Sequence, residues 1–423
     1  MSMHKFKATL GKSKLVRPND TILIAHSGKA NSTVLAQLVT LDADESISKK
    51  LKFQSKVLYI DDGMVKGRTI EERESLRNAF AKEAESVNLP TYILSLSKSM
   101  SDTISDNISL INESRITSCK EDVVLQESFE NLESDTARDE LLRQLRQKLL
   151  ILAARKLNCN KVFVADTSVD LAIKVLGDIS TGRGSQLPFN VAFSDVRHAD
   201  AMLLRPLRDF TGEDINGYLD CCQLYPIFNS QKHDVLFPAS IRSITKDFVH
   251  QLDTEYCGTV STIYRTSEKL ATRIKELARV KNTPSKDVND SCIICELPID
   301  PPCSGKNQLS VMQAQLFSKQ VSTVKDPSSN ILTTNSFDTC ERSSNGTVQT
   351  MNNLKMQDCQ CHSTSCNNFE REKVVEKQLC YSCRLIFLDP KQVDNGLPTF
   401  ILKAMEKKLQ IARLRDEIED FLL

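Results

Sequence analysis

The stretch Thr21-Ile-Leu-Ile-Ala-His-Ser-Gly-Lys-Ala-Asn-Ser-Thr-Val-Leu-Ala-Gln-Leu-Val39 decides the fold. It opens with an apolar run at residues 22–25, which has the length of a buried strand. It closes with apolar residues at positions 34, 35, 38 and 39, the spacing of one helix face. The small polar residues 27–32 between them predict a strand-to-helix turn. Backbone N–H groups and the helix dipole make such a turn favourable for phosphate.

The same alternation continues along the chain. Further apolar runs predict strands at residues 56–60, 91–95, 161–165 and 201–204, with helical patterns between and after them. Alternating strands and helices predict an α/β fold with a parallel sheet. Ligands of such sheets bind beyond the carboxyl ends of the strands, where residues 27–32 are expected to lie.

Composition divides the 423 residues into three parts. We expect an α/β domain over residues 1–282, with a polar insertion or long loop at about 97–133. Residues 283–397 hold two Cys-x-x-Cys pairs around a polar segment, about 304–372, which is expected to be disordered. Residues 398–423 predict an amphipathic helix.

The bulk charge does not indicate a nucleic-acid partner, because 55 basic residues balance 55 acidic ones. Any basic surface must therefore be local. The start of the chain has no apolar signal sequence, and no stretch is long enough to span a bilayer. We therefore expect a cytoplasmic protein without membrane contact, whose 14 cysteines stay reduced.

The two cysteine pairs predict a metal site. They read Cys292-Ile-Ile-Cys295 and Cys380-Tyr-Ser-Cys383. Each pair forms a knuckle that presents two thiolates, and four thiolates suit a tetrahedral structural zinc ion with Zn–S distances of ~2.3 Å. The separation between the pairs exceeds that of the usual zinc ribbon, so two unrelated reduced pairs are the alternative.

Residues 27–32 resemble the PP-loop, S-G-G-x-D-S, of the N-type ATP pyrophosphatases. Ser27, Gly28 and Ser32 match that motif, whereas Lys29 replaces a glycine and Asn31 replaces the aspartate. The resemblance implies a loop that holds the pyrophosphate end of ATP. An ordinary strand-to-helix turn is the alternative.

Longer motifs make the resemblance more specific. They include His4-Lys-Phe-Lys7, Tyr264-Arg-Thr-Ser-Glu-Lys-Leu270 and Gln378-Leu-Cys-Tyr-Ser-Cys-Arg384. In order and spacing the chain, from residue 4 to about 420, resembles the cytoplasmic tRNA 2-thiolation protein subunit 2 family. That resemblance implies a complex that makes 5-methoxycarbonylmethyl-2-thiouridine at the wobble position of tRNAs for Lys, Glu and Gln. It also implies a heterodimer with a catalytic PP-loop subunit that receives sulfur from a thiocarboxylated ubiquitin-related carrier, a pathway linked to protein urmylation.

The chain departs from its catalytic relatives where chemistry is done. Those relatives carry a Cys-x-x-Cys pair before the helix at 135–157, but residues 133–137 here contain no thiol. Their ATP- and magnesium-binding box corresponds to residues 165–174, where only Asp170 keeps an expected acid. Family members also commonly carry a cysteine-rich knuckle before the His4 stretch, so a short form or a misassigned start is expected.

These departures favour a non-catalytic subunit that binds tRNA and supports the catalytic partner. Whether ATP still binds is left open. The degenerate nucleotide- or phosphate-binding set is Ser27, Gly28, Lys29, Ser32, Asp61 and Asp170. The basic residues proposed to contact tRNA are Lys5, Lys12, Lys14, Arg183, Arg197 and Arg205. For Arg205, an ion pair with Asp195 or Asp209 is the alternative.

Two other functions stay open at this stage. One is an ATP-using sulfurtransferase with its own diverged active site, in which a cysteine of the C-terminal part carries sulfur. The other is a zinc-binding interaction module on an α/β scaffold.

Overall fold

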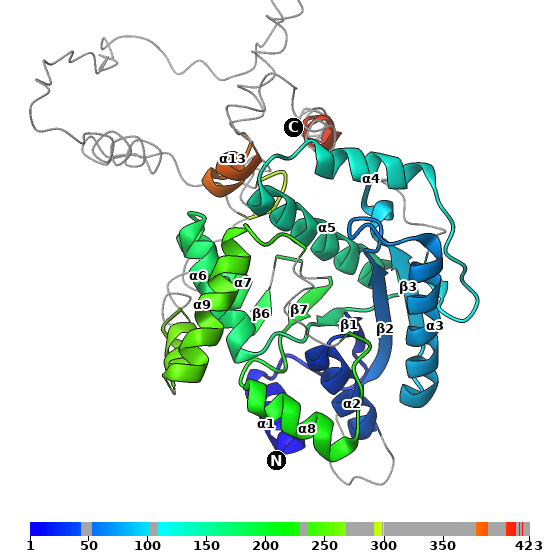
Figure 1. The fold of residues 1–423 in the computed structure, drawn as a ribbon, viewed down its shortest axis with the longest axis vertical. Coiled ribbons are helices and arrows are strands. Elements are labelled where there is room, and N and C mark those ends of the chain that lie inside the picture. Colours follow the sequence, from blue (N-terminus) through cyan, green and yellow to red (C-terminus); the bar gives the residue numbers. More distant parts are fainter. Residues whose placement is uncertain are drawn as a thin grey trace, which may run out of the picture. The chain divides into compact units, whose positions relative to one another are not determined.

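The computed structural model describes residues 1–43, 53–100, 108–195, 197–198, 200–228, 236–256, 258–267, 292–297, 299, 378–387, 403–411, 414 and 417. Within these ranges the strands form one sheet in the order β4-β3-β2-β1-β5-β7-β6 (Figure 1). Its parallel strands are β1 (Thr21–His26), β2 (Gln54–Asp61), β3 (Thr91–Ser95), β5 (Lys161–Phe163) and β7 (Met202–Leu204). The short strands β4 (Ser109–Leu110) and β6 (Ser194–Asp195) pair antiparallel at the two edges. The predicted α/β class with a parallel sheet is confirmed.

The strand order of the sheet reverses at β1. The chain adds β2 and β3 on one side of β1 and then returns to place β5 on the other side. On the β2 side, Thr21 lies opposite Gln54 and His26 opposite Tyr59. Residues 27–32 leave the carboxyl end of β1 at this switch point, the position at which open α/β sheets bind ligands.

Helices connect and cover the strands. They are α1 (Ser2–Ser13), α2 (Ala30–Ala43), α3 (Ile70–Val87), α4 (Lys120–Glu130), α5 (Asp135–Lys156), α6 (Ser168–Ser180), α7 (Leu187–Val191), α8 (Gly212–Cys222), α9 (Ile241–Glu255) and α13 (Tyr381–Phe387). Two 3₁₀ turns are η1 (Leu96–Met100) and η2 (Gly184–Gln186), and residues 259–267 and 403–411 are also helical. Among the described residues, no helix combines the length and the apolar character needed to cross a membrane.

Capping boxes set the start of several helices. One box opens α3, where Thr69 Oγ1 accepts the N–H of Glu72 and the Glu72 carboxylate accepts the N–H of Thr69. The same reciprocal pair of bonds opens α6 at Thr167 and α8 at Thr211. Each box satisfies two backbone donors that a helix start leaves unpaired.

Residues 97–133 were predicted to be a polar insertion or a long loop, and the described residues of this range are not one long loop. This range contains the end of η1, the edge strand β4 and three turns of α4. Helix α4 buries Leu125 and Phe129, which are four residues apart and so lie on one face. The apolar signal is short and surrounded by polar residues, which is why sequence periodicity missed it.

The main core lies between the sheet and helices α1, α2 and α8. It contains Phe6 and Leu10 of α1, Ile22 and Ile24 of β1, and Leu35 of α2, all at most 2% exposed. Residues 1–299 and 377–423 belong to one compact unit. The predicted domain boundary near residue 282 and the polar segment 304–372 lie outside the described residues.

Candidate functional site

The loop 27–32 is closed by hydrogen bonds of its own. Ser32 Oγ accepts the N–H of Ser27 (3.2 Å), contacts Ser27 Oγ (3.2 Å) and donates to the carbonyl of Lys29 (2.8 Å). The N–H of Gly28 donates to Nδ1 of His26 (3.1 Å). Two of the backbone donors that a phosphate loop offers to a ligand are therefore used within the protein.

Two aromatic rings cover the glycine of this loop. Gly28 has φ of +74°, and a Cβ there would lie 2.7 Å from Phe80 Cζ and 2.9 Å from Phe228 Cδ2. The N–H of Phe228 donates to the Gly28 carbonyl (2.8 Å), so the segment ending at residue 228 pairs with the loop as a single parallel bridge at Lys29. Phe228 thus packs directly against the backbone that would face a pyrophosphate.

Asp170, the acid that the sequence retains, is engaged in the start of α6. Its Oδ2 accepts the N–H of Thr167 (3.0 Å), the hydroxyl of Thr167 (2.8 Å) and Nδ2 of Asn31 (2.8 Å). One carboxylate oxygen therefore completes a capping box and links α6 to the first turn of α2. Asn31, which replaces the aspartate of the PP-loop motif, is a donor here.

Asp61, the other predicted acid, is also engaged. Its Oδ2 accepts from Nε (2.9 Å) and Nη2 (2.7 Å) of Arg73, and its Oδ1 accepts the N–H of Gly63 (3.0 Å). Both side chains of the pair are 2% exposed. Neither Asp61 nor Asp170 offers the free carboxylates that a magnesium site requires.

Three cations lie near Lys29 of the loop. Burial lowers the pKa of Lys29, and Lys246 of α9, Lys66 of the β2–α3 connection and Arg146 of α5 lower it further. We call these four residues the cation cluster.

Asp62 is the acidic partner within the cation cluster. Lys66 Nζ lies 2.9 Å from Asp62 Oδ1, and Arg146 donates to Asp62 Oδ2. Burial alone would raise the pKa of Asp62, but Arg146 and Lys66 hold it at about 2. One aspartate therefore neutralises part of the cluster, and the remaining positive charge favours an anion at the carboxyl edge of the sheet.

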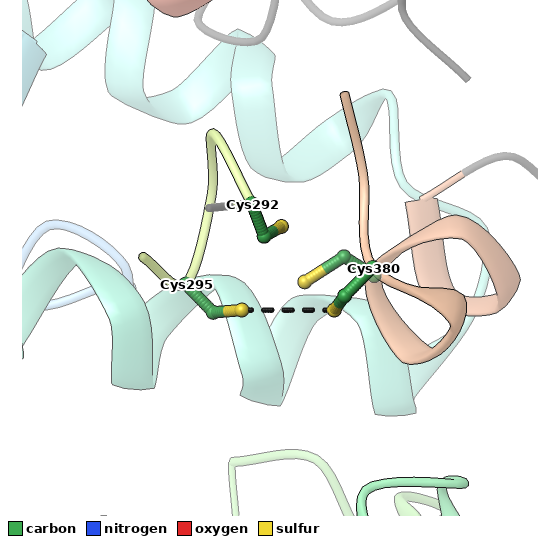
Figure 2. Close-up of side chains that lie close together, drawn as sticks. Cys292, Cys295 and Cys380 are labelled. Atoms are coloured by element: carbon green, nitrogen blue, oxygen red, sulfur yellow. Dashed lines mark hydrogen bonds between the residues drawn. The ribbon is translucent and has the colours of Figure 1, made fainter. Parts of the chain in front are cut away.

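The four predicted metal ligands come together. Cys292, Cys295, Cys380 and Cys383 are all at most 2% exposed, and their Sγ atoms lie within 4.8 Å of one another (Figure 2). Cys295 Sγ and Cys380 Sγ are 3.7 Å apart, against about 3.8 Å for the edge of a tetrahedron with Zn–S of ~2.3 Å. The geometry and the donor set of this cysteine cluster fit one tetrahedral metal ion.

The cysteine cluster is attached to the α/β domain. Helix α13 packs on α5 (Figure 1), and the N–H of Ile293 donates to the carbonyl of Gln378 (3.1 Å), which joins the two knuckles. Arg197 Nη1 donates to the carbonyl of Cys295 (2.9 Å), and His198 lies 3.0 Å from Glu296. Both knuckles therefore pack against the α/β domain.

Three arginines proposed to contact tRNA form ion pairs within the fold. Arg183 is 1% exposed and is paired with Glu140, and Arg197 is paired with Asp195. Arg205, 3% exposed, takes the ion-pair alternative, but its partner is Asp166 (3.0 Å) and not Asp195 or Asp209. These three guanidinium groups are turned toward protein partners.

The lysines of the predicted tRNA set differ from one another. Lys5 pairs with Asp214 of α8 (2.6 Å) and lies over the Phe210 ring, so it links α1 to α8. Lys12 and Lys14 are exposed at the end of α1. Of the six residues proposed to contact tRNA, these two are the exposed ones.

Sequence reasoning missed two residues that lie at the loop. Phe228 and Lys246 come from elements far along the chain, and no local pattern predicts their approach. His26, the last residue of β1, is the exception, because it is only two residues from Gly28 in the sequence. Its Nδ1 accepts the N–H of Gly28.

Comparison with known proteins agrees with the sequence motifs. A family profile described as cytoplasmic tRNA 2-thiolation protein 2 matches residues 240–385. The cytoplasmic tRNA 2-thiolation protein 2 of Danio rerio is 30% identical over 467 residues, which cover 100% of this chain and 88% of the relative. The Homo sapiens protein of that name is 26% identical, and the match covers 100% of this chain and 87% of the relative. The Drosophila persimilis protein is 33% identical, and the match covers 71% of this chain and 70% of the relative.

Similarity to solved structures is weaker. The U34-tRNA thiolase NcsA from Methanococcus maripaludis, solved with its [4Fe-4S] cluster, has a TM-score of 0.45 and 16% identity, covering 64% of this chain and 78% of that one. The NH3-dependent NAD synthetase from Campylobacter jejuni has a TM-score of 0.28 and 14% identity, and the match covers 63% of this chain and 91% of that one. Sequence similarity over nearly the whole length of the Danio rerio relative is decisive, and this chain belongs to the cytoplasmic tRNA 2-thiolation protein 2 family.

Proposed function

We propose that this chain is a non-catalytic subunit of the cytoplasmic complex that 2-thiolates wobble uridine to 5-methoxycarbonylmethyl-2-thiouridine in tRNAs for Lys, Glu and Gln. It binds tRNA and supports a catalytic PP-loop subunit in a heterodimer. That partner receives sulfur from a thiocarboxylated ubiquitin-related carrier, and the pathway is linked to protein urmylation. Membership of the family supports the link to tRNA thiolation.

The engagement of Asp61 and Asp170 carries the non-catalytic assignment. A nucleotide-dependent adenylation needs carboxylates free to hold magnesium, and these two are used by Arg73 and by the cap of α6. Residues 133–137 also contain no thiol to accept sulfur. The carboxylates that would hold magnesium in a catalytic subunit instead stabilise the fold of this chain.

The cation cluster supports tRNA binding. Lys29, Lys66, Arg146 and Lys246 supply positive charge without a metal ion, which suits a phosphate of the tRNA backbone. The exposed Lys12 and Lys14 extend the proposed contacts. We do not include Arg183, Arg197 or Arg205, because their guanidinium groups are buried in ion pairs.

Zinc is the metal proposed for the cysteine cluster. Four thiolates that share one ion select zinc over magnesium or calcium. An iron–sulfur cubane places one iron at each cysteine, so its ligands stand farther apart than sulfurs that share one ion. The role is structural, since four protein ligands leave no open position for a substrate.

A rescue assay tests the proposal. In cells that lack the chain, thiolated tRNA is detected by its retardation in a gel containing a mercury reagent. The intact chain should restore the retarded bands, and so should Asp170→Asn at matched cellular abundance, since the carboxylate is not used for catalysis. Release of pyrophosphate from ATP by the purified chain alone would instead support the alternative, a diverged ATP-using sulfurtransferase. Bands that do not depend on the chain would leave only a zinc-binding interaction module.

Binding of tRNA is tested separately with purified protein. Lys29→Ala should lower the affinity for tRNA about three- to tenfold and reduce the slope of its salt dependence by about one, as loss of one phosphate contact does. The matched control is Lys156→Ala, an exposed lysine at the end of α5, next to the amino ends of the strands. Equal affinities of the two variants would contradict a phosphate site at Lys29.

A further inference from the structure

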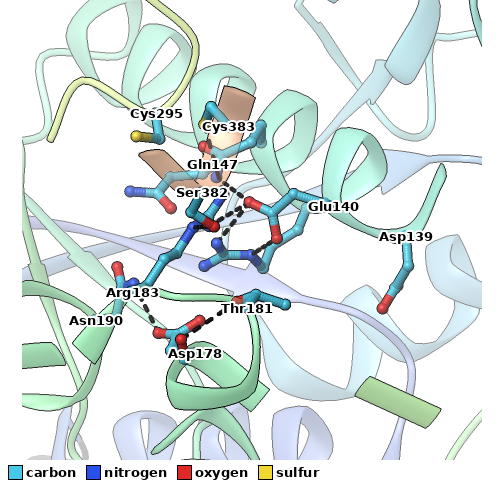
Figure 3. A network of polar contacts seen from close by, with 12 residues as sticks. Asp139, Glu140, Gln147, Asp178, Thr181, Arg183, Asn190, Cys295, Ser382 and Cys383 are labelled. Atoms are coloured by element: carbon cyan, nitrogen blue, oxygen red, sulfur yellow. Dashed lines mark hydrogen bonds and ion pairs between the residues drawn. The ribbon is translucent and has the colours of Figure 1, made fainter. Parts of the chain in front are cut away.

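A buried arginine lies between the cysteine cluster and helix α5. The side chain of Arg183 is 0% exposed. On one side its Nη2 donates to Cys383 Sγ (3.5 Å) and its Nε donates to Ser382 Oγ (2.9 Å), as Figure 3 shows. The guanidinium therefore touches both a metal-ligating sulfur and the residue next to it.

The other side of the same guanidinium is held by α5. Arg183 Nη1 is paired with Glu140, whose carboxylate also accepts from Arg143 Nη2 (2.7 Å). Burial alone would raise the pKa of Glu140, but Arg143 and Arg183 hold it well below its usual range. Glu140 is thus a fixed anion that orients Arg183 toward the sulfur.

The backbone around Arg183 is built for this position. Gly182 has φ of +78°, and a Cβ there would lie 2.6 Å from Tyr381 Cε1, so the absence of a side chain lets Tyr381 pack on the turn. The N–H of Arg183 donates to the carbonyl of Asp178 at the end of α6 (2.7 Å). The turn that carries Arg183 therefore contacts α6 on one side and Tyr381 of the second cysteine knuckle on the other.

The charge of a metal site explains what such an arginine does. A divalent ion with four thiolates has a net negative charge, and burial of that charge is unfavourable unless donors and cations surround it. Groups that hydrogen-bond to metal ligands typically change metal affinity by about 10- to 100-fold when they are removed. A guanidinium gives a charge-assisted bond to the sulfur.

We propose that Arg183 is a positioning residue of the metal site: its guanidinium stabilises the metal-bound thiolate of Cys383 and ties the occupied cluster to Glu140 of α5. Metal occupancy and the packing of α13 on α5 are then one coupled event. This inference rests on the metal site alone and does not depend on the role in tRNA thiolation.

The test uses the full chain, loaded with zinc or with cobalt(II), which occupies tetrahedral thiolate sites and gives a visible sulfur-to-metal charge-transfer band. Arg183→Met should lose zinc to a chelator about tenfold faster than the parent chain. Its cobalt charge-transfer band should move to longer wavelength, because the sulfur regains electron density when the donor is removed. A chain with Cys380→Ser and Cys383→Ser defines the background from the other cysteines.

Two further variants separate positioning from general stability. Arg183→Lys keeps a cation and should give a smaller shift of the cobalt band and slower zinc loss than Arg183→Met. Asn190→Ala removes a buried hydrogen bond to Asp178 (2.8 Å) nearby without touching the cluster. It should lower Tm yet leave zinc loss and the cobalt band unchanged. The proposal is overturned by an unmoved cobalt band in Arg183→Met, or by equal zinc loss from Arg183→Met and Asn190→Ala.

Discussion

At the residue scale, the two predicted acids are part of the hydrogen bonding that holds the fold. Asp61 and Asp170 are the acids that the family resemblance assigns to nucleotide binding. In this chain each has acquired cationic or amide donors from another element. A carboxylate that accepts several hydrogen bonds inside the protein stabilises the folded state.

The loop glycine provides a residue-scale prediction about stability. Gly28→Ala should destabilise the protein by about 2–4 kcal/mol, because the new Cβ meets Phe80 and Phe228 at a positive φ. Gly67→Ala shares a positive φ of +65° but has nothing within 4 Å, so it should cost only about 1 kcal/mol. Gly177→Ala, inside α6 with open space, should be neutral or stabilising. Urea unfolding measures all three, and similar values for Gly28→Ala and Gly67→Ala would contradict the proposed packing.

Asp62 provides a residue-scale prediction about pH. Its pKa in the folded protein is about 2, below the ordinary value of 3.8, so the unfolded chain takes up the proton first as pH falls. The ion pairs with Lys66 and Arg146 should therefore contribute about 1–2 kcal/mol above pH 5 and lose it between about pH 4 and pH 2. The stability difference between the parent and Asp62→Asn should shrink over that interval in urea unfolding at pH 7, 4 and 3. A difference that stays constant with pH would rule out this assignment.

At the scale of single elements, helix starts do much of the positioning. Asp170 is the third residue of α6 and also the acceptor for Asn31, so the capping box of α6 holds the first turn of α2 beside it. The loop at residues 27–32 and the start of α6 are joined by this one carboxylate. Cap formation and loop closure are consequently coupled.

The capping box of α6 should matter more than that of α3. Asp170→Ala should destabilise the protein by about 1–2 kcal/mol, because it removes the cap and the bond to Asn31 together. Glu72→Ala removes the equivalent residue from the exposed box of α3 and should cost about 0.5 kcal/mol. Thermal unfolding with and without magnesium and ATP completes the measurement. Protection of the parent but not of Asp170→Ala by magnesium and ATP would show that the carboxylate still binds nucleotide.

At the scale of the whole molecule, the cysteine knuckles are structural members of the α/β unit. Residues 292–297 and α13 are far apart in the chain, yet both contact the α/β unit, the first through Arg197 and the second through Arg183. Leu379 and Phe387 add apolar packing, each at most 1% exposed. A metal ion at the cluster would therefore staple the C-terminal part onto the domain.

Removal of the metal should loosen that attachment selectively. After chelation under reducing conditions, backbone hydrogen exchange should accelerate in residues 292–297, in α13 and in the turn at 181–186. Strands β1 and β2 should keep their protection, because their core does not involve the cluster. Cys221→Ser, which alters an exposed thiol on α8, is the control and should behave as the parent. Unchanged exchange in α13 after chelation would mean that apolar packing alone holds the knuckles.

The sequence by itself determined the features that depend on local spacing. The apolar runs predicted the parallel strands, and two Cys-x-x-Cys pairs predicted one cluster despite their separation. Each of these signals works over a few residues, because strand burial and knuckle formation are set by neighbours in the chain.

Only the tertiary structure decided which charged residues are free. Arg183 looked like a cation between two glycines in a loop, yet its partner Ser382 lies 199 residues away. Arg205 and Asp61 were settled in the same manner by Asp166 and Arg73. Whether a side chain forms a buried ion pair or faces a ligand depends on which distant segment packs against it. The residues next to it in the sequence do not specify that contact.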